Sequence, residues 1–243
     1  MAATVRWGSG LHVAVPMAKR GGLSYSKSEI DRIGDRLRDE QVESEILVKL
    51  DAYRESFEPA YQEVVSRIRE ELKIAPTGRP GKSIPSILHK LNRESIRLSQ
   101  MQDIAGCRIV VVDIPDQDEV LRLLGRLFGD ARTIDRRIRP SHGYRAVHVV
   151  ARIAGLPVEI QVRTDLQHLW AEYSEMMADA VDKDVKYGEG PVELRELLAS
   201  AARLVQDLES IPATAELAWR EERRLDVINM FQKLIRDGEK LRR

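Results

Sequence analysis

The chain has 243 residues, of which 43% are hydrophobic, 32% are charged and only 5% are aromatic. This composition excludes a largely disordered chain and predicts an aliphatic core, as in helices packed on a sheet. Lysine plus arginine and aspartate plus glutamate both number 39, so the formal net charge is zero and any anion-binding site must be local. The single cysteine, Cys107, excludes an intramolecular disulfide and a cysteine metal cluster.

The first 20 residues lack the pattern of a targeting or membrane segment. Their apolar run, from Leu11 to Val15, is much shorter than a membrane span or a signal-peptide core. We therefore expect a cytoplasmic protein with no membrane span.

The segment 1–73 is predicted to be an N-terminal helical extension packed on the core. Ser26 and Glu29 form a capping pattern before apolar residues at helical spacing, and this helix is expected to end near Asp39. A second helical pattern runs through residues 46–72, and Pro59 is expected to bend or break it.

The segment 74–185 has the pattern of an α/β (mixed α+β) domain. A loop rich in glycine and proline precedes a helix, and an apolar run is typical of a buried strand. Two later β-rich runs, separated by Ala154 to Pro157, predict a hairpin. We expect a central mixed β-sheet flanked by helices, with these elements in chain order: a helix from Ile84, a strand over 104–113, a helix over 116–128, strands over 147–153 and 158–162, and a helix over 165–181.

The segment 186–243 is predicted to form C-terminal helices. One apolar stripe is expected on a first helix, and a second stripe follows a loop at Pro212. Periodicity does not decide whether these helices dock on the core, form an oligomer or bind a partner. The first stripe consists of Leu194, Leu197, Leu198, Ala201 and Leu204.

A basic loop precedes the helix that begins near Ile84. Arg79, Lys82 and Lys90 bracket Ser83, so cations, a hydroxyl and free backbone N–H groups could converge on phosphate groups. Taken alone, these residues are more typical of a solvated basic turn than of a phosphate site.

Two carboxylates fall on strands that are expected to be neighbours. Asp103 precedes the strand that contains Arg108, while Glu159 and Gln161 share one face of a later strand. Mg²⁺ prefers oxygen ligands of this kind. The alternative is an ion pair at the sheet edge, in which Arg108 or Arg163 neutralises the acids.

The stretch 135–148 is rich in cations around a proline and a glycine. An exposed Tyr144 could stack on a nucleotide base beside the arginines, whereas the alternative is a tyrosine ring in the core. In the following helix, His168 and Glu172 share a face and Trp170 is expected to pack. His168 is either a ligand or a structural residue, and no zinc-hydrolase pattern is present in the sequence.

Four motifs in chain order resemble the RelA/SpoT-type (p)ppGpp synthetase domain. They are Gly-Arg-Pro-Gly-Lys-Ser-Ile from Gly78, Asp-Ile-Ala-Gly-Cys-Arg-Ile-Val from Asp103, Gly-Tyr-Arg-Ala-Val-His from Gly143 and Glu-Ile-Gln-Val-Arg-Thr from Glu159. The resemblance implies a nucleotidyltransferase-like synthetase fold and a stand-alone pyrophosphokinase, that is, a diphosphotransferase of the GTP pyrophosphokinase type. Such an enzyme moves the β,γ-pyrophosphate of ATP to a ribose 3′-hydroxyl.

The resemblance also implies a role for each matching residue. ATP would be bound by Arg79, Lys82, Ser83, Lys90 and Arg108. Mg²⁺ would be bound by Asp103 and Glu159, which with Arg108 form the expected catalytic set. The acceptor would be bound by Tyr144, Arg136, Arg137, Arg139, His148, Gln161 and His168.

Two segments differ from the usual alarmone-synthetase pattern and are closest to the toxic small alarmone synthetases. They are residues 135–142, before Gly143, and residues 174–179, after the tryptophan helix. This branch includes enzymes that modify the 3′-CCA end of tRNA, so the resemblance implies a toxin that inhibits translation. The arginines, with Lys19 and Arg20, would then contact the tRNA backbone.

Other acceptors and partners stay open at this point. The alternative function is a small alarmone synthetase that makes (p)ppGpp or (p)ppApp from guanine or adenine nucleotides. A remote alternative is an inactive RNA- or nucleotide-binding module. A toxin would require a neutralising antitoxin protein, and association into a homo-oligomer is neither predicted nor excluded.

Overall fold

The computed structural model describes residues 3–6, 12–15, 25–39, 42–181, 183–211 and 217–241. The chain divides into two compact units, each built from separate segments. The predicted three-part division at residues 74 and 186 stays a prediction. The first unit comprises Met1–Arg108, Leu124–Arg132 and Val150–Ile160, and the second comprises Ile109–Leu123, Thr133–Val149 and Gln161–Arg243.

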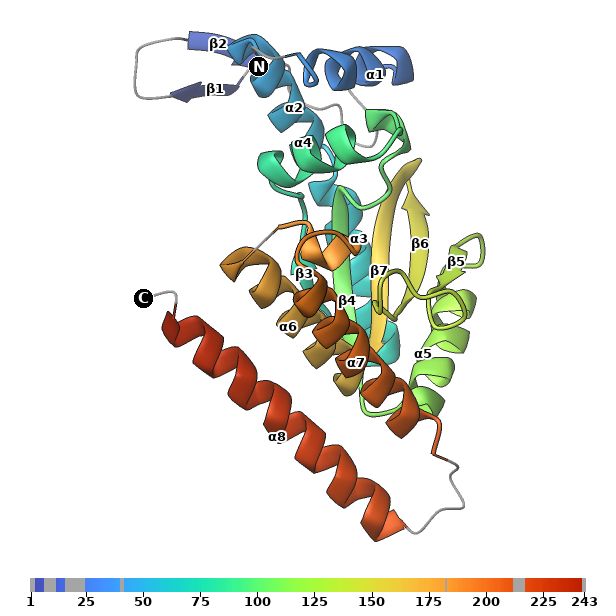
Figure 1. The fold of residues 1–243 in the computed structure, drawn as a ribbon. Coiled ribbons are helices and arrows are strands. Elements are labelled where there is room, and N and C mark those ends of the chain that lie inside the picture. The colour runs from blue at the N-terminus through green and yellow to red at the C-terminus, as the bar shows by residue number, and fades with distance from the viewer. Residues whose placement is uncertain are drawn as a thin grey trace. The chain divides into compact units, whose positions relative to one another are not determined.

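The N-terminal segment is helical after a short hairpin that the sequence did not predict. Strands β1 (Ala3–Arg6) and β2 (His12–Val15) pair antiparallel (Figure 1). The capping box of Ser26 and Glu29 is present at the start of α1, as predicted. The helices of this segment are α1 (Lys27–Arg36), α2 (Ser44–Glu55), α3 (Glu58–Arg67) and the π-helical turn η1 (Ile68–Leu72).

The predicted break near Pro59 lies slightly earlier in the chain. Helix α2 ends at Glu55, and Pro59 occupies the first turn of α3. A proline is tolerated there because the N–H groups of a first turn have no partner within the helix.

Five strands form a mixed sheet in the order β3-β4-β7-β6-β5, which Figure 1 shows. Strand β3 pairs antiparallel with β4, and Gly78 lies opposite Cys107. The sequence missed β3 and β5 because their residues are mostly exposed and carry no hydrophobic alternation. The strands are β3 (Thr77–Arg79), β4 (Ala105–Val111), β5 (Arg132–Asp135), β6 (Val147–Ile153) and β7 (Leu156–Thr164).

The β6–β7 hairpin has a tighter turn than the sequence predicted. Ala154 (φ 49°) and Gly155 (φ 83°) form a two-residue turn, and Leu156 and Pro157 already belong to β7. Positive φ at both central residues matches the right-handed twist of the paired strands. The predicted fold class, a mixed sheet with flanking helices, is confirmed.

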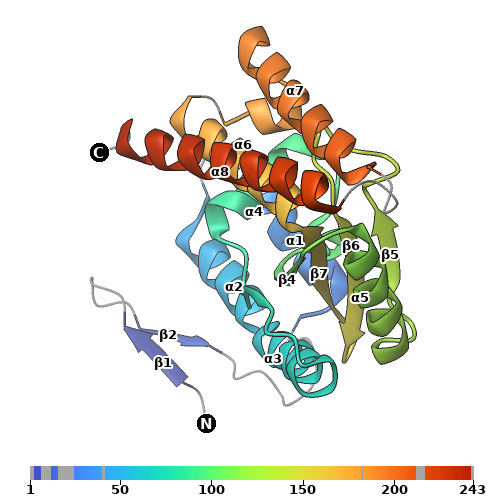
Figure 2. The same ribbon diagram turned by 90° about the horizontal axis from the view of Figure 1, so that it is seen from below.

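The remaining helices follow β3 in the chain, and those from residue 165 onward share a second cluster of buried apolar residues. In the second unit, α8 lies across α6 (Figure 2), and Tyr173 packs edge-on against Phe231 with ring centroids 5.7 Å apart. The helices are α4 (Ile84–Arg93), η2 (Leu98–Gln100), α5 (Ile114–Leu127), α6 (Asp165–Ala180), η3 (Val185–Tyr187), α7 (Val192–Glu209) and α8 (Leu217–Leu241).

The buried face of α7 differs from the predicted stripe. Leu198, Ala202 and Val205 are buried, whereas Leu197 and Leu204 are 46% and 37% exposed. Because leucines occur on more than one face of this helix, spacing alone did not identify the face that packs. The predicted stripe was therefore partly wrong.

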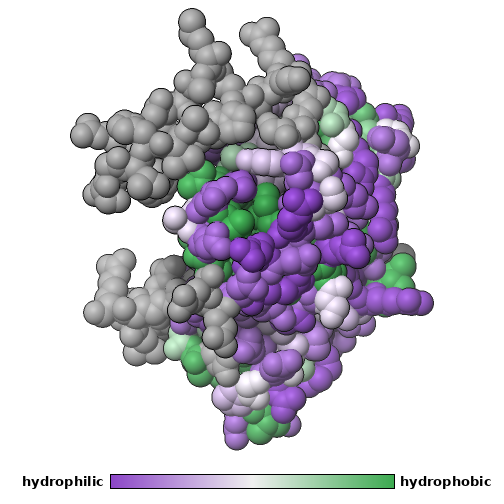
Figure 3. Space-filling view, turned by 90° about the horizontal axis from the view of Figure 1, so that it is seen from above, coloured by the Kyte–Doolittle hydropathy of each residue, from purple (hydrophilic) through white to green (hydrophobic). Residues whose placement is uncertain are grey.

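One face of the described surface is largely polar. In Figure 3 the described residues are mainly hydrophilic, with several small hydrophobic areas between them. No helix among the described residues combines the length and the apolar character needed to cross a membrane.

Two helix glycines give a matched test of the packing. A Cβ at Gly34 in α1 would lie 2.7 Å from the Cβ of Leu98, whereas a Cβ at Gly125 in α5 would meet no atom within 4 Å. Alanine in an exposed helix interior stabilises by about 0.5–1 kcal/mol relative to glycine. We expect Gly125→Ala to raise the free energy of unfolding by that amount and Gly34→Ala to lower it, as measured by urea denaturation. Stabilisation by Gly34→Ala would contradict the described contact with Leu98.

Candidate active site

The basic loop in the first unit is held by backbone hydrogen bonds. The Lys82 N–H donates to the carbonyl of Ile104 (2.6 Å), and Arg54 Nε donates to the carbonyl of Lys82 (2.5 Å). Gly81 packs against Arg54, because a Cβ there would lie 3.4 Å from Arg54 Nη2. The loop therefore has a fixed path just before α4.

Ser83 is the N-cap of α4. Its hydroxyl accepts from the Ser86 N–H (3.4 Å) and donates to Ser86 Oγ (2.7 Å). The side chain thus has a structural role beside its predicted contact with phosphate. Arg79 is exposed at the end of β3.

Asp103 lies between two lysines. Lys82 Nζ is 2.7 Å from Asp103 Oδ2, and Lys90 Nζ is 3.0 Å from Oδ1. Burial alone would raise the pKa of Asp103, but the two ammonium groups lower it to about 2. Three of the predicted site residues therefore form one partly buried ionic cluster.

Glu159 lies in β7, against the chain of β4. A Cβ at Gly106 would lie 2.9 Å from the carbonyl oxygen of Glu159, so glycine allows the two strands to approach at this point. Burial, with a contribution from the charge of Glu159, raises the pKa of the Cys107 thiol to about 12. Cys107 is thus an inert core residue, and Glu159 and Arg108 are half-buried.

The oxygen donors of Asp103 and Glu159 fit a hard divalent cation in chemical type. Asp103 is ionised over the physiological pH range, as a metal ligand must be. Both of its oxygens already bind lysine ammonium groups, so a cation would have to share or replace these contacts.

In the second unit, Ser141 to Tyr144 form a tight turn. Tyr144 N–H donates to the Ser141 carbonyl (2.9 Å), and Ser141 N–H donates to the Tyr144 carbonyl (3.2 Å). The two central residues, His142 (φ 51°) and Gly143 (φ 90°), are both left-handed. This pair of conformations fixes where the chain presents Tyr144, and we call residues 141–145 the acceptor turn.

Arg163 contacts two of the predicted acceptor-binding residues. Its Nη2 donates to the Tyr144 hydroxyl (3.0 Å) and to Gln161 Oε1 (2.8 Å), and its guanidinium lies 5.0 Å from the Tyr144 ring centroid. His148 Nε2 is 2.9 Å from the same hydroxyl. Tyr144 is thus half-buried, and a set of polar residues orients its ring.

Arg163 itself was not predicted as a site residue. It is 6% exposed, and the sequence suggested it only as a counter-ion for the strand carboxylates. Its place two residues after Gln161, on the same face of β7, was the signal that could have identified it.

The three arginines before Gly143 differ in their surroundings. Arg137 pairs with Asp135 (2.8 Å) and Asp118 (2.7 Å), and its side chain is only 17% exposed. Burial alone would raise the pKa of Asp135, but Arg137 lowers it overall. Arg136 and Arg139 are exposed, so they are the arginines of this loop that solvent reaches freely.

The last predicted residues fall in α6 and in the N-terminal segment. His168 Nε2 lies 3.3 Å from Glu172 Oε1, which agrees with the predicted shared face. Trp170 is 3% exposed and donates to the Leu198 carbonyl (3.0 Å), so it packs as expected. Lys19 and Arg20 lie outside the described residues.

The ionic cluster predicts a pH-dependent contribution to stability. Because the pKa of Asp103 in the fold (about 2) is below its ordinary value of 3.8, its charge stabilises the fold above about pH 4, and this contribution is lost as the pH falls toward 2. We expect Asp103→Asn to lower the free energy of unfolding by about 2 kcal/mol at pH 7. Urea denaturation at several pH values should show the difference from the wild type shrinking below about pH 4. A difference independent of pH would contradict the cluster.

Known proteins resemble part of this chain. A family model described as the region found in RelA/SpoT proteins matches residues 78–187. An uncharacterised protein of Mycobacterium tuberculosis is 40% identical over 146 residues, which are 58% of this chain and 53% of that protein. The chain therefore spans about half the length of this curated relative.

Two solved structures are similar to this chain. A GTP pyrophosphokinase family protein from Streptococcus pneumoniae is 25% identical with a TM-score of 0.55, covering 73% of this chain and 97% of its own. The small alarmone synthetase 1 from Bacillus subtilis is 28% identical with a TM-score of 0.50, covering 64% and 91%. The resemblance carried by the four motifs is confirmed, because residues 78–187 match the region found in RelA/SpoT proteins.

Proposed function

We propose that the protein is an ATP-dependent pyrophosphokinase that transfers the β,γ-pyrophosphate of ATP to a ribose 3′-hydroxyl. The observation that carries this proposal is the cluster of Lys82, Lys90 and Asp103, in the same unit as Glu159 and Arg108. Two ammonium groups facing one carboxylate leave a net positive charge, which favours a polyphosphate.

The donor side would bind the triphosphate of ATP. Lys82 and Lys90 would turn from Asp103 toward phosphate oxygens, and the exposed Arg79 would close on them from β3. Arg108, opposite Thr77 in the β3–β4 pairing, would add a fourth cation. This neutralisation allows an oxygen nucleophile to approach the β-phosphorus.

Asp103 and Glu159 are the residues that would hold Mg²⁺. When bound, the ion would neutralise charge that develops on the phosphate oxygens. If the lysines contacted the triphosphate, the Asp103 oxygens would be available to such a cation. Glu159 could also accept the proton of the acceptor hydroxyl, but a carboxylate that binds a metal tightly is a poor base. We therefore assign Glu159 the role of metal ligand.

The acceptor side would bind a nucleoside through the second unit. Tyr144 would stack on the base of the acceptor. Gln161, which Arg163 orients, and His148, which contacts the Tyr144 hydroxyl, would contact the edges of the base or the sugar. His168 is a further polar contact, on α6. Strand β7 contains Glu159 of the donor set and Gln161 of the acceptor set.

The acceptor that we propose first is the 3′-CCA end of tRNA. Exposed Arg136 and Arg139 precede the acceptor turn and offer charge to an RNA backbone, whereas Arg137 holds its own loop. Such an enzyme would act as a translation toxin in the cytoplasm and would need an antitoxin.

A guanine or adenine nucleotide is the second candidate acceptor. It is favoured by the similarity to two solved structures, a GTP pyrophosphokinase family protein and a small alarmone synthetase. Both candidates use the same donor residues, so they differ only in what the acceptor turn and its arginines contact.

An assay with γ-labelled ATP tests the activity. The protein is incubated with Mg²⁺ and with tRNA, GDP, GTP or AMP, and labelled products are separated. We expect label in tRNA, and we expect Glu159→Gln to lower the rate by about a hundredfold or more because a metal ligand is lost. Glu119→Gln, on the exposed side of α5, is the matched control and should keep full activity.

Two other labelling results would exclude parts of this proposal. Label in GDP or GTP with unlabelled intact tRNA would exclude the tRNA acceptor in favour of alarmone synthesis. No transfer by the wild type to any of the four acceptors would exclude the enzyme and favour the binding module.

The exposed arginines give a separate test of the acceptor. We expect the double variant Arg136→Ser/Arg139→Ser to lower tRNA labelling by about tenfold at 0.15 M salt, because contacts to the RNA backbone are lost. Labelling of a free nucleotide should be unchanged. Arg126→Ser, an exposed arginine on α5, is the control. Equal losses with tRNA and nucleotide would mean that these arginines do not read the RNA backbone.

A further inference from the structure

A buried polar network connects the end of α7 to the start of α6. Glu209 Oε1 accepts from Thr164 Oγ1 (2.5 Å) and from Gln167 Nε2 (3.0 Å), and the Glu209 side chain is 6% exposed. Thr164 and Gln167 are each 1% exposed. A carboxylate in such a place is costly to bury unless its oxygens are bonded.

The same network reaches the loop before the acceptor turn. Gln167 Oε1 accepts from Gln117 Nε2 (3.0 Å), and Gln117 Oε1 accepts from Arg137 Nη1 (3.2 Å). Gln117 is fully buried and also donates to the Val162 carbonyl (2.8 Å). A continuous hydrogen-bond chain therefore runs from Glu209 to Arg137.

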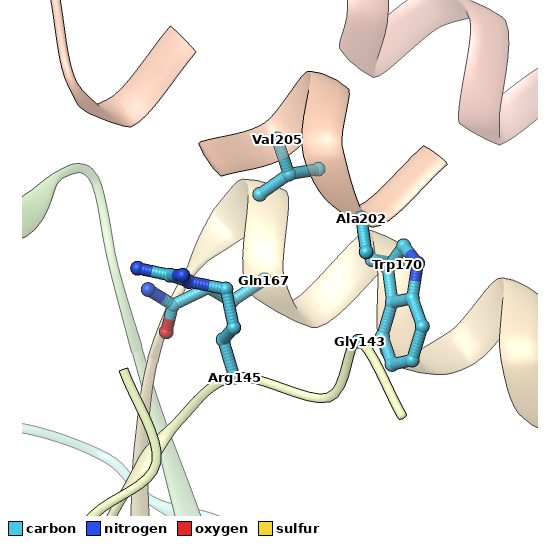
Figure 4. A pocket seen from close by; sticks show the side chains of 6 residues that line it. All are labelled: Gly143, Arg145, Gln167, Trp170, Ala202 and Val205. Carbon is cyan, nitrogen blue, oxygen red and sulfur yellow. The ribbon is translucent and has the colours of Figure 1, made fainter. Parts of the chain in front are cut away.

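The acceptor turn itself contacts the same two helices. A Cβ on Gly143 would lie 2.8 Å from the Ala202 Cβ of α7 and 2.9 Å from the Trp170 ring of α6. Figure 4 shows Gly143 beside Trp170 and Ala202, and Arg145 on the same side as Gln167. The turn is therefore packed against α6 and α7 with almost no free space at Gly143.

Charge adds to this packing at Arg145. Its Nε is 3.9 Å from Glu209 Oε2, and the two side chains are 14% and 6% exposed. Burial raises the pKa of Glu209 above its ordinary value, and the bonds from Thr164 and Gln167 and the charge of Arg145 oppose this shift only in part. Glu209 is thus a buried acid that has an interaction with the residue after Tyr144.

We propose that Glu209 is a positioning residue that holds the acceptor turn in the conformation that presents Tyr144 to the acceptor. It acts on the turn from two directions, through Arg145 after Tyr144 and through Gln167, Gln117 and Arg137 before it. Glu209 lies beyond residues 78–187, so this assignment gives α7 a part in the reaction. The effect on acceptor binding rests on the function proposed above.

The test uses the full chain with three variants. Glu209→Ala removes the carboxylate, Glu209→Gln keeps one acceptor oxygen, and Asp207→Ala changes an exposed acid in the same helix turn as the control. Two quantities are measured: amide hydrogen exchange by mass spectrometry, and the KM values for ATP and for the acceptor that the wild type uses. Exchange is compared between peptides covering 137–149 and peptides covering 82–108.

We expect Glu209→Ala to speed exchange in 137–149 by about tenfold, with exchange in 82–108 unchanged, because the lost bonds are local to the second unit. KM for the acceptor should rise by about tenfold and KM for ATP by less than about twofold. Glu209→Gln should give smaller changes in the same direction, and it decides the question if the alanine variant does not fold. Asp207→Ala should match the wild type.

Three results would overturn the inference: exchange that rises equally in both peptide sets, exchange in 137–149 that no Glu209 variant changes, or equal rises in the two KM values. A wild type that transfers pyrophosphate to no acceptor would refute the proposed function alone. The exchange measurement would still decide whether Glu209 holds the turn.

Discussion

The contact of Asp103 with two lysines is the interaction on which the account of the donor side depends. In a partly buried place, one carboxylate facing two ammonium groups stays ionised and leaves a net positive charge. Backbone bonds of the loop before α4 place Lys82, and Lys90 lies in α4 itself, so both backbone positions are fixed. A triphosphate would meet cations already gathered, which lowers the cost of assembling the site.

On the proposed acceptor side, a buried arginine holds the neighbouring polar residues in place. Arg163 bonds both Tyr144 and Gln161, and it lies near the Tyr144 ring. The acceptor turn is also held by close packing at position 143, where only glycine fits, and by the hydrogen-bond network that ends at Glu209. On both the proposed donor side and the proposed acceptor side, charged groups with little exposure hold polar side chains in place. The specificity for an acceptor would come from the acceptor side.

Long periodic elements could be predicted from the sequence. Short exposed strands and contacts between distant segments could not. The helix from Ile84 and the strand of Cys107 follow strong apolar patterns, whereas β3 and β5 are short and mostly exposed. The motifs grouped the predicted donor residues, but Asp118, which pairs with Arg137, and the partners of Glu209 come from segments distant in the chain. Such contacts depend on packing, which periodicity does not contain.

The nucleotide products formed from ATP distinguish transfer of pyrophosphate from transfer of a single phosphate. With ATP labelled at the β-phosphorus, a pyrophosphokinase places the label in the acceptor and releases one AMP for each acceptor modified. A simple kinase would leave that label in ADP. We predict that the β-label appears in the acceptor together with an equimolar amount of AMP. ADP as the nucleotide product would contradict pyrophosphate transfer.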